Sequence, residues 1–388
     1  MDDVRRFIER SRQHERAGDY DAAQRDAEAA LSLADDQSFA AARAQLAAVA
    51  RAQGRAGDAL ALVEGFDSPD AALERASAFL DLSRLDEAEA SYKSIQSRTA
   101  SQRHALQLGL AGVARARGEY DAAEHVLRDA IAFAEREFGA DSYELAEGLN
   151  SLGMVFKYAG RPDEGVALYR RALAILECLY GEIHPDVASI YHNLGGIEHA
   201  RREYEVAEKY ARRSVEIRRT SLGPNHLAVA EDEAALAPIL VALGEYAKAE
   251  ELFKRAIPIL EATLGPTHPE VGAAFNNLAA FYERKGDVSG AEQAYERALE
   301  AKETLLGPHH PSVAITLNNL ARNAADRGEV VEARALYERA IAILEPRVTA
   351  EHPTLLSARR NYEKLERAVR EETRATDRLE DASEKGEP

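Results

Sequence analysis

Apolar residues recur along the chain at steps of three and four, the spacing that places side chains on one face of a helix. The stretch 268–309 contains two such helices, with Gly286 and Asp287 interrupting the pattern between them. Their apolar faces are Phe275, Leu278, Ala279 and Tyr282 in the first helix and Ala291, Tyr295, Ala298 and Leu299 in the second. Neither helix can bury its face alone, so the unit needs a similar unit on each side.

The unit is repeated with a period of 42 residues, which two series of residues mark. One is the histidine before each first helix, and the other is the turn glycine, with Arg202 at the one turn that lacks glycine. The series are His184, His226, His268, His310 and His352, and Gly118, Gly160, Gly244, Gly286 and Gly328. Repetition at a period of about 20 to 50 residues, with two helices in each unit, predicts an all-α solenoid.

The period divides the chain into four parts. Residues 1–99 hold divergent helix pairs, in which Ser83 takes one turn position, and residues 100–351 hold six units of 42 residues. Within these units glycine ends the second helix and proline begins the next first helix. We expect one capping helix over residues 352–378, because terminal units close a stack, and a polar, disordered tail over residues 379–388. The expected total is nine helix pairs and a cap.

These units resemble a known repeat family. The positions of Leu278, Ala279, Tyr282, Gly286, Ala291, Tyr295 and Ala298 have the spacing of the tetratricopeptide repeat. The 42-residue form, LGxxHPxVAxxLNNLA, resembles the repeats of kinesin light chains and their bacterial relatives over roughly residues 100–351. The resemblance implies a right-handed α-solenoid whose first helices line a concave groove for a peptide of a partner protein.

Composition and charge narrow the classes of function. The formal net charge of −18 is unsuited to nucleic-acid binding, because phosphate recognition needs a basic surface. The N-terminus is charged where a secretory signal would be apolar, and no run of about 18 or more apolar residues occurs, so we expect a cytoplasmic protein without a membrane partner. Cys178 is the one cysteine, which excludes a disulfide framework, and its place in an apolar helix predicts that it is buried. A preference for arginine over lysine, with abundant alanine, favours a bacterial source.

The regularly spaced histidines suggest metal ligands, but the geometry of a repeat array opposes that role. Equivalent side chains in stacked repeats lie on the order of 10 Å apart, whereas zinc binds its ligands at about 2 Å. We therefore expect the histidines to act at helix N-termini. The sequence also lacks a Ser/His/Asp, Cys/His or HExxH arrangement and a Gly-rich phosphate loop. We expect no metal, no cofactor and no catalytic activity.

Asparagines occupy two adjacent positions of the first helix in several units. Asn is a mediocre helix former, so its repetition has either a structural reason, a hydrogen bond to a neighbouring helix, or a functional one, an amide offered to a peptide backbone. In the repeats that the chain resembles, this asparagine contacts bound peptide. The resemblance therefore implies a peptide-binding groove of Asn193, Asn277, Asn319 and Asn361, preceded by Asn150, Asn276 and Asn318, with Lys157, Arg284 and Arg322 one helical turn further on.

One unit departs from the pattern. Ala235 stands where asparagine is expected, Pro238 lies inside the first helix and Pro258 inside the second. Proline removes a backbone donor and is expected to kink or loosen a helix, at about 3 kcal/mol. The sequence leaves open whether this is tolerated divergence or a division of the groove into two binding segments.

These features predict a noncatalytic scaffold that binds a peptide segment of another protein in its concave groove. The alternative is a regulatory sensor, in which a bound peptide changes the curvature of the superhelix and thereby switches a separate effector. Self-association through an end repeat remains open. The partner, the ligand sequence and the pathway lie beyond the sequence.

Overall fold

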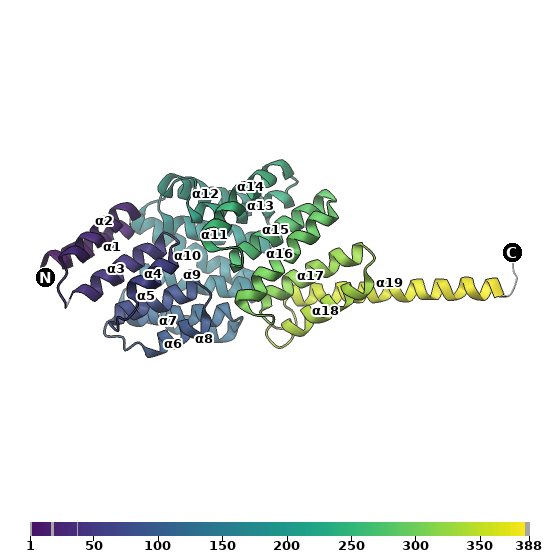
Figure 1. Ribbon diagram of the computed structural model, residues 1–388, viewed down its shortest axis with the longest axis horizontal. Helices are drawn as coiled ribbons and strands as arrows, with labels where there is room; N and C mark the ends of the chain where they lie inside the picture. Colours follow the sequence, from purple (N-terminus) through teal and green to yellow (C-terminus); the bar gives the residue numbers. More distant parts are fainter. Residues whose placement is uncertain (1, 17–18, 37, 385–388) are drawn as a thin grey trace.

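The computed structural model describes residues 2–16, 19–36 and 38–384, and these residues form helices without any strand (Figure 1). The helices make nine antiparallel pairs and a single last helix, which confirms the all-α solenoid and the expected count. In chain order they are α1 (Asp2–Arg16), α2 (Tyr20–Leu33), α3 (Phe39–Ala52), α4 (Ala56–Val63), α5 (Pro69–Asp81), α6 (Leu85–Ser94), α7 (Ala100–Ala116), α8 (Tyr120–Glu137), α9 (Tyr143–Tyr158), α10 (Pro162–Tyr180), α11 (Pro185–Ala200), α12 (Tyr204–Leu222), α13 (Leu227–Ala242), α14 (Tyr246–Leu264), α15 (Pro269–Lys285), α16 (Val288–Leu306), α17 (Pro311–Asp326), α18 (Val330–Leu344) and α19 (Pro353–Glu384). Across that part of the chain, each helix is too short or too polar to cross a membrane.

The turn inside each pair needs one residue with a left-handed backbone, which glycine adopts without strain. Two non-glycine residues of the described chain have positive φ, Ser83 at 57° and Arg202 at 66°. Both occupy predicted turn positions, Arg202 from the 42-residue period and Ser83 from the break between two helices of the divergent N-terminal pairs. The periodic spacing therefore predicts the backbone conformation at a turn even where the residue type opposes it.

The strain at Arg202 leads to a stability prediction. We expect Arg202→Gly to raise the free energy of unfolding by about 1 kcal/mol, because an L side chain in this conformation costs about 1–2 kcal/mol. The matched control is the reverse change, Gly244→Arg, at the equivalent turn one unit later, where φ is 80°. Thermal unfolding followed by circular dichroism should show opposite shifts. Shifts of the same sign would contradict backbone strain as the cause.

The hydrophobic core runs as a strip between the helices of successive pairs. The second helices bury a row of aromatic side chains, each 42 residues apart except where Ala211 interrupts the row. Its members are Tyr169, Phe253, Tyr295 and Tyr337, which are at most 2% exposed. Small residues face them; a Cβ added to Gly153 would lie 2.7 Å from the Tyr169 ring. This close packing sets a regular angle between pairs, and that angle accumulates into the superhelix.

The superhelix completes one turn in five helix pairs, so the second turn lies against the first. From α11 onward, each first helix begins beside the C-terminal end of the first helix five pairs earlier. The contacts join His184 Nε2 to the Arg16 carbonyl, Leu227 to Gly54, His268 Nε2 to the Asp81 carbonyl at 3.3 Å, His310 Nε2 to the Ala116 carbonyl, and His352 Nε2 to the Tyr158 carbonyl at 3.1 Å. We call this row of contacts the seam. It closes the concave groove of the superhelix into an interior channel.

Three expectations need correction. Cys178 is exposed, because it lies two residues beyond the buried Leu176 and so points away from the core face of α10. The last helix continues past residue 378 to Glu384, which makes residues 379–384 helical, as the helix-forming Leu, Ala and Glu residues among them allow. It extends beyond the body of the stack (Figure 1). The rest of the expected tail, 385–388, lies outside the described residues. Helices α13 and α14 each continue through their internal prolines, Pro238 and Pro258.

Candidate functional site

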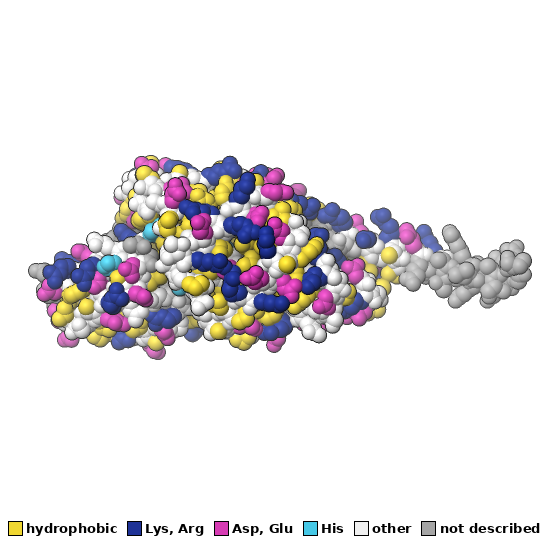
Figure 2. Space-filling view, turned by 90° about the horizontal axis from the view of Figure 1, so that it is seen from above, with side chains coloured by type: hydrophobic (Ala, Val, Ile, Leu, Met, Phe, Trp, Pro, Cys, Tyr) yellow, Lys and Arg dark blue, Asp and Glu magenta, His cyan; other side chains and the backbone are white. Residues whose placement is uncertain are grey.

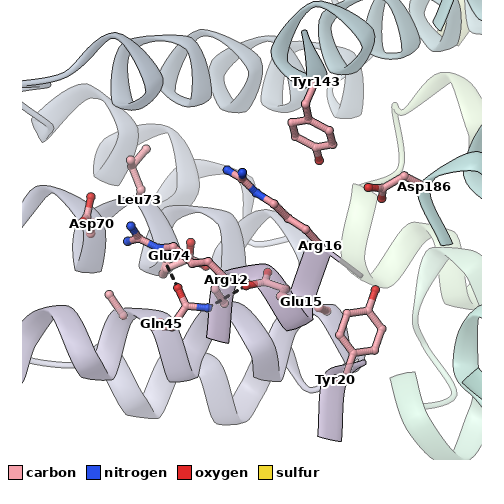
Figure 3. Close-up of a pocket in the computed structure, with 13 residues that line it drawn as sticks. Arg12, Glu15, Arg16, Tyr20, Gln45, Asp70, Leu73, Glu74, Tyr143 and Asp186 are labelled. Atoms are coloured by element: carbon pink, nitrogen blue, oxygen red, sulfur yellow. Dashed lines mark hydrogen bonds between the residues drawn. The ribbon is translucent and has the colours of Figure 1, made fainter. Parts of the chain in front are cut away.

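First helices line the interior channel, and its cavities draw side chains from both superhelical turns. One cavity of about 390 Å³ lies near the N-terminal end, with α1, α3 and α5 on one side and α9 and α11 on the other (Figure 3). Arg12 Nε donates a hydrogen bond to Gln45 Oε1 at 3.0 Å, and Gln45 Nε2 donates to Glu15 at 2.8 Å. Tyr143 and Asp186 face these groups across the cavity (Figure 3). The channel wall is therefore polar and carries both signs of charge.

A second cavity, of about 320 Å³, lies between α9, α11, α13 and α15. Four alanines form its floor, and polar side chains of both charges surround them. The floor is Ala234, Ala235, Ala273 and Ala274, and the polar residues include Lys157, His192, Arg218, Glu231, Glu270 and Asn277. We call this the alanine-floored cavity. It contains two of the residues that the sequence predicted for the groove, Lys157 and Asn277.

Most of the predicted asparagines pair with one another across neighbouring first helices, at an offset of 43 residues. Nδ2 of Asn193 donates to Asn150 Oδ1 at 2.8 Å, Nδ2 of Asn319 to Asn276 Oδ1 at 3.4 Å, and Nδ2 of Asn361 to Asn318 Oδ1 at 3.2 Å. The structural reason for repeating asparagine is thus present in the fold. Each amide also keeps hydrogen-bonding capacity beyond this one bond.

The row of asparagine pairs breaks at α13. Ala234 and Ala235 stand there at the two positions that both carry asparagine in α15 and α17. Because its partner position is Ala234, Asn277 has no hydrogen-bond partner among the described residues, and it lines the alanine-floored cavity. Two alanines therefore do two things at once: they open the cavity and leave one amide available inside it.

The three basic residues of the predicted groove lie in different surroundings. Lys157 Nζ lies 5.6 Å from the centroid of the Tyr158 ring, at the edge of the alanine-floored cavity. Arg284 is exposed at the C-terminal end of α15. Arg322 forms an ion pair of 2.5 Å with Glu283. The structure therefore brings Lys157 to Asn277 and places Arg284 and Arg322 outside this cavity.

Two carboxylates that face the channel have raised pKa values. Burial, reinforced mainly by the neighbouring charges of Asp186 and Glu144, raises the pKa of Glu147 to about 7. Burial also raises the pKa of Glu231 to about 7, against the opposing influence of Arg218. The Glu147 side chain is nevertheless 41% exposed, because the space it faces is the channel, with chain on the far side. The channel interior is thus enclosed without being filled.

A buried polar network fixes α11, α12 and α13 to one another beside the cavity. The Asp232 carboxylate is fully buried and accepts hydrogen bonds from Arg218 Nη1 at 3.0 Å and from the Ser214 hydroxyl. His192 Nδ1 lies 2.6 Å from the same carboxylate. Asp232 stands between serine and histidine, whereas nucleophilic catalysis needs histidine in contact with the serine. We therefore interpret the network as structural.

Inspection of the sequence missed this network, although the 42-residue period contains a signal for it. Each second helix has one residue that meets the following first helix, and the two residues match in polarity. The matched positions are Leu176 with Ile190, Arg218 with Asp232, Leu260 with Ala274, Lys302 with Thr316, and Leu344 with Ala358. Contacts confirm the two polar matches, since Lys302 Nζ donates to Thr316 Oγ1 at 2.9 Å.

Over the described part of the chain, no group of three or more histidine, cysteine and carboxylate side chains is arranged to hold a metal ion. The capping role expected for the histidines is confirmed: Nδ1 of each of the five accepts a backbone N–H two residues ahead, at 3.1 to 3.2 Å. On the outer face seen in Figure 2, acidic and basic side chains are interspersed without a broad patch of one sign. The channel is the more distinctive surface.

Comparison with known proteins agrees with this architecture. The tetratricopeptide repeat family matches residues 102–177, 186–262, 234–304 and 270–345, and a second description of the same repeat matches 150–221. No curated protein matches the sequence.

Among solved structures, one shows the same fold over most of this chain, and two others are similar over part of it. A Rap protein in complex with Competence and Sporulation Factor is 13% identical, with a TM-score of 0.66 over 89% of this chain and 99% of that chain. BtubC (BKLC) from P. vanneervenii is 22% identical, with a TM-score of 0.42 over 59% of this chain and 89% of its own. A putative kinesin light chain from Podosopora anserina is 26% identical, with a TM-score of 0.38 over 50% and 92%. With most of its length matched by the family and with paired helices stacked throughout, the chain belongs to the tetratricopeptide repeat family.

Proposed function

We propose that this protein is a noncatalytic interaction scaffold that binds an extended peptide segment of a partner protein in its interior channel. The observation that carries the proposal is the unpaired amide of Asn277 above the alanine floor, at the one point where the asparagine row breaks. The Asn277 side chain is partly exposed to this cavity, so its donor and acceptor groups are available to a ligand that can pair with both. The break therefore favours a binding role for this place.

The chemistry of the cavity suits a peptide backbone. An extended peptide presents N–H and C=O groups, and an asparagine amide can donate to one and accept from the other. The volume of about 320 Å³ lies at the lower end of the range for ligand pockets, about 300–1,000 Å³, enough for a short segment. Lys157 on one wall and Glu231 and Glu270 on another offer partners to charged side chains or chain ends.

The remaining predicted groove residues take secondary places in this proposal. Asn193, Asn319 and Asn361 contact the peptide with the amide groups that their own pairs leave over, and Asn150, Asn276 and Asn318 hold those amides in position. Arg284 and Arg322 contact a segment that continues toward α17. The Rap protein was solved in complex with Competence and Sporulation Factor, and that precedent supports ligand binding by a superhelix of this fold.

Two adjacent asparagines separate the structural and the binding role. We expect Asn277→Ala to leave stability unchanged and to weaken peptide binding about fivefold, since one hydrogen bond contributes about 1 kcal/mol. Asn276→Ala is the matched control, because Asn276 Oδ1 accepts from Thr316 at 3.2 Å and from Asn319 at 3.4 Å. It should lower the free energy of unfolding by about 1 kcal/mol.

The ligand for this test is obtained by phage display of random peptides on the wild-type protein, and affinities are measured by isothermal titration calorimetry. Peptides that bind the wild type and the Asn277→Ala variant equally would show that Asn277 is not part of the site. Failure to select any peptide against the folded protein would contradict the proposed function itself.

The regulatory alternative is favoured by one feature of the fold. Among the described residues, helices of the two superhelical turns meet through their ends and connectors, mainly along the seam, so a ligand that changes the spacing of the pairs can separate the turns. A change in the radius of gyration on binding a selected peptide, measured by small-angle scattering, would support a sensor. An unchanged radius of gyration would favour the scaffold over the sensor.

A further inference from the structure

The residue type at the first-helix N-cap differs between the two superhelical turns. In the first turn this position holds serine or threonine, and in the second turn it holds histidine. The first set is Ser38, Ser68, Thr99 and Ser142, and the second is His184, His226, His268, His310 and His352. A first-turn N-cap has no earlier turn beside it, whereas a second-turn N-cap lies against the end of a helix five pairs earlier.

Histidine is suited to this position because its two ring nitrogens can serve two helices. Nδ1 accepts the backbone N–H that begins its own helix, as serine does, which fixes the proton on Nε2. Nε2 then donates to a last carbonyl of the earlier helix, a group that lacks an intrahelical partner. His352 shows both bonds, from Thr354 N at 3.2 Å and to the Tyr158 carbonyl at 3.1 Å. One side chain thus satisfies two helix ends in different turns.

The seam is also shaped to bring the two turns close together. A Cβ added to Gly118 would lie 2.5 Å from Pro311, and one added to Gly160 would lie 2.6 Å from Pro353. The turn glycine of the first superhelical turn therefore makes room for the proline that follows the histidine in the second. Sequence features 193 residues apart are matched to each other at both places.

The seam is nevertheless the weakest interface in the stack. Neighbouring pairs pack helix against helix, whereas helices one superhelical turn apart meet only through their ends and connectors. One hydrogen bond contributes about 0.5–1.5 kcal/mol, much less than a buried helix face. At His226 the bond is missing: Nε2 has no partner, and a cavity of about 780 Å³ separates α3, α4 and α5 from α13. The seam can therefore open while the pairs stay intact.

We propose that this histidine seam is a gate on the channel: while it is closed, only an extended chain gains access, and a folded partner gains access only when the seam opens. The inference rests on the proposed function in one respect, that the channel is the binding site. It adds the class of partner, an unfolded segment or tail rather than a folded surface, and the element that regulates access to the site.

The gate can be tested without a natural ligand, by the reactivity of a cysteine placed in the channel. Ala235 is a suitable position, because it lines the alanine-floored cavity and its equivalents in other units are the larger asparagine. The variant Ala235→Cys is made with Cys178→Ser, and native Cys178, exposed on the outer face, is the reference in the wild type. Two probes are compared, a maleimide on a Gly/Ser-rich peptide and a maleimide on a folded SH3 domain.

We expect Cys178 to react with both probes at similar rates and the channel cysteine to react at least about tenfold more slowly with the folded probe, in proportion to a minor open state. His184, His310 and His352 are then replaced together by Asn, which keeps an N-cap acceptor but is too short to cross the seam. This variant should raise the reaction rate of the folded probe with the channel cysteine and leave the rate of the peptide probe unchanged. Unchanged circular dichroism shows that the variant remains folded.

A locked seam supplies the opposite test. The variant Gly118→Cys, Pro311→Cys brings two Cβ atoms to about 3.8 Å, a distance that a disulfide spans. After oxidation the folded probe should no longer reach the channel cysteine, and the peptide probe should still react. Two results would overturn the gate. One is equal reaction rates of both probes with the channel cysteine of the closed protein. The other is a folded-probe rate that neither the triple histidine variant nor the oxidised disulfide variant alters. Either result is independent of whether Asn277 binds a peptide.

Discussion

Replacing Asp232 by alanine is expected to lower the free energy of unfolding by about 3–5 kcal/mol, because it leaves a buried charge without its partner. Arg218 is 9% exposed and donates a hydrogen bond to Asp232 at 3.0 Å. The next carboxylate on α13 is that of Glu231, which lies 3.9 Å from Arg218 Nη1. His192 and Ser214 lose an acceptor at the same time. Urea denaturation followed by circular dichroism measures the loss.

The chain contains the control for this experiment. One unit later, the positions of Arg218 and Asp232 are taken by Leu260 and Ala274, which pack without any charge. We therefore expect the double variant Arg218→Leu, Asp232→Ala to recover stability to within about 1 kcal/mol of the wild type, since apolar replacement of a buried ion pair is often neutral or stabilising. A double variant as unstable as the single one would show that the network does more than neutralise buried charge.

The helix pairs were predictable because they depend on local spacing. The 42-residue period placed Arg202 at a turn, and the break between two helical faces placed Ser83 at another; both have a left-handed backbone there against their own preference. Burial along a single helix was less predictable: Cys178 lies in an apolar stretch of α10 and yet points outward. Such a stretch can turn any of several faces to the core, and the neighbouring helices decide which one.

The seam could not be predicted from the sequence. It joins residues such as Tyr158 and His352, and their meeting depends on how many pairs make one superhelical turn. That number results from a small rotation at every interface, added over five pairs, and no local pattern contains it. The histidines were correctly assigned to N-caps because capping is local, whereas the second bond of each histidine is not.

The candidate site was predictable in part for the same reason. Repeated asparagines indicated the first helices as the lining of the groove, and the structure places Asn277 and Lys157 in one cavity there. The different surroundings of Asn276 and Asn277 depend on a residue 43 positions away: Asn319 donates to Asn276, whereas the position that would pair with Asn277 is Ala234. Sequence periodicity identifies equivalent positions, and contacts between units decide what each one does.

The stability of the fold should depend on pH through the seam histidines. Burial lowers the pKa of His310 to about 4, and the charges of Lys302, Arg347 and Arg115 act in the same direction. Burial also lowers the pKa of His226 and of His352. Between pH 6.5, the ordinary pKa of histidine, and about pH 4, the unfolded chain binds protons that the folded protein does not. Stability contributed by these groups is complete above about pH 6.5 and falls as the pH falls toward 4.

Two carboxylates act in the opposite direction. The pKa values of Glu147 and Glu231, about 7, lie above the ordinary value, so the folded protein holds protons there that the unfolded chain releases. Their contribution grows as the pH falls from about 7 to about 4.5 and partly offsets the loss from the histidines. The pH profile of the wild type alone is therefore not diagnostic, and the seam must be isolated by comparing two proteins.

The variant His310→Asn isolates it, because asparagine keeps an N-cap acceptor and removes both the titration and the bond to Ala116. At about pH 7 we expect the variant to be about 1 kcal/mol less stable than the wild type, the contribution of one hydrogen bond. Near pH 4.5 the order should reverse, since lowering the pKa of His310 from 6.5 to about 4 removes about 2.5 kcal/mol from the wild type alone at that pH. Urea denaturation across this range measures the crossing, with His125→Asn at an exposed site of α8 as the control for the exchange itself. A difference between wild type and variant that stays constant with pH would show that protonation of His310 does not act on the seam.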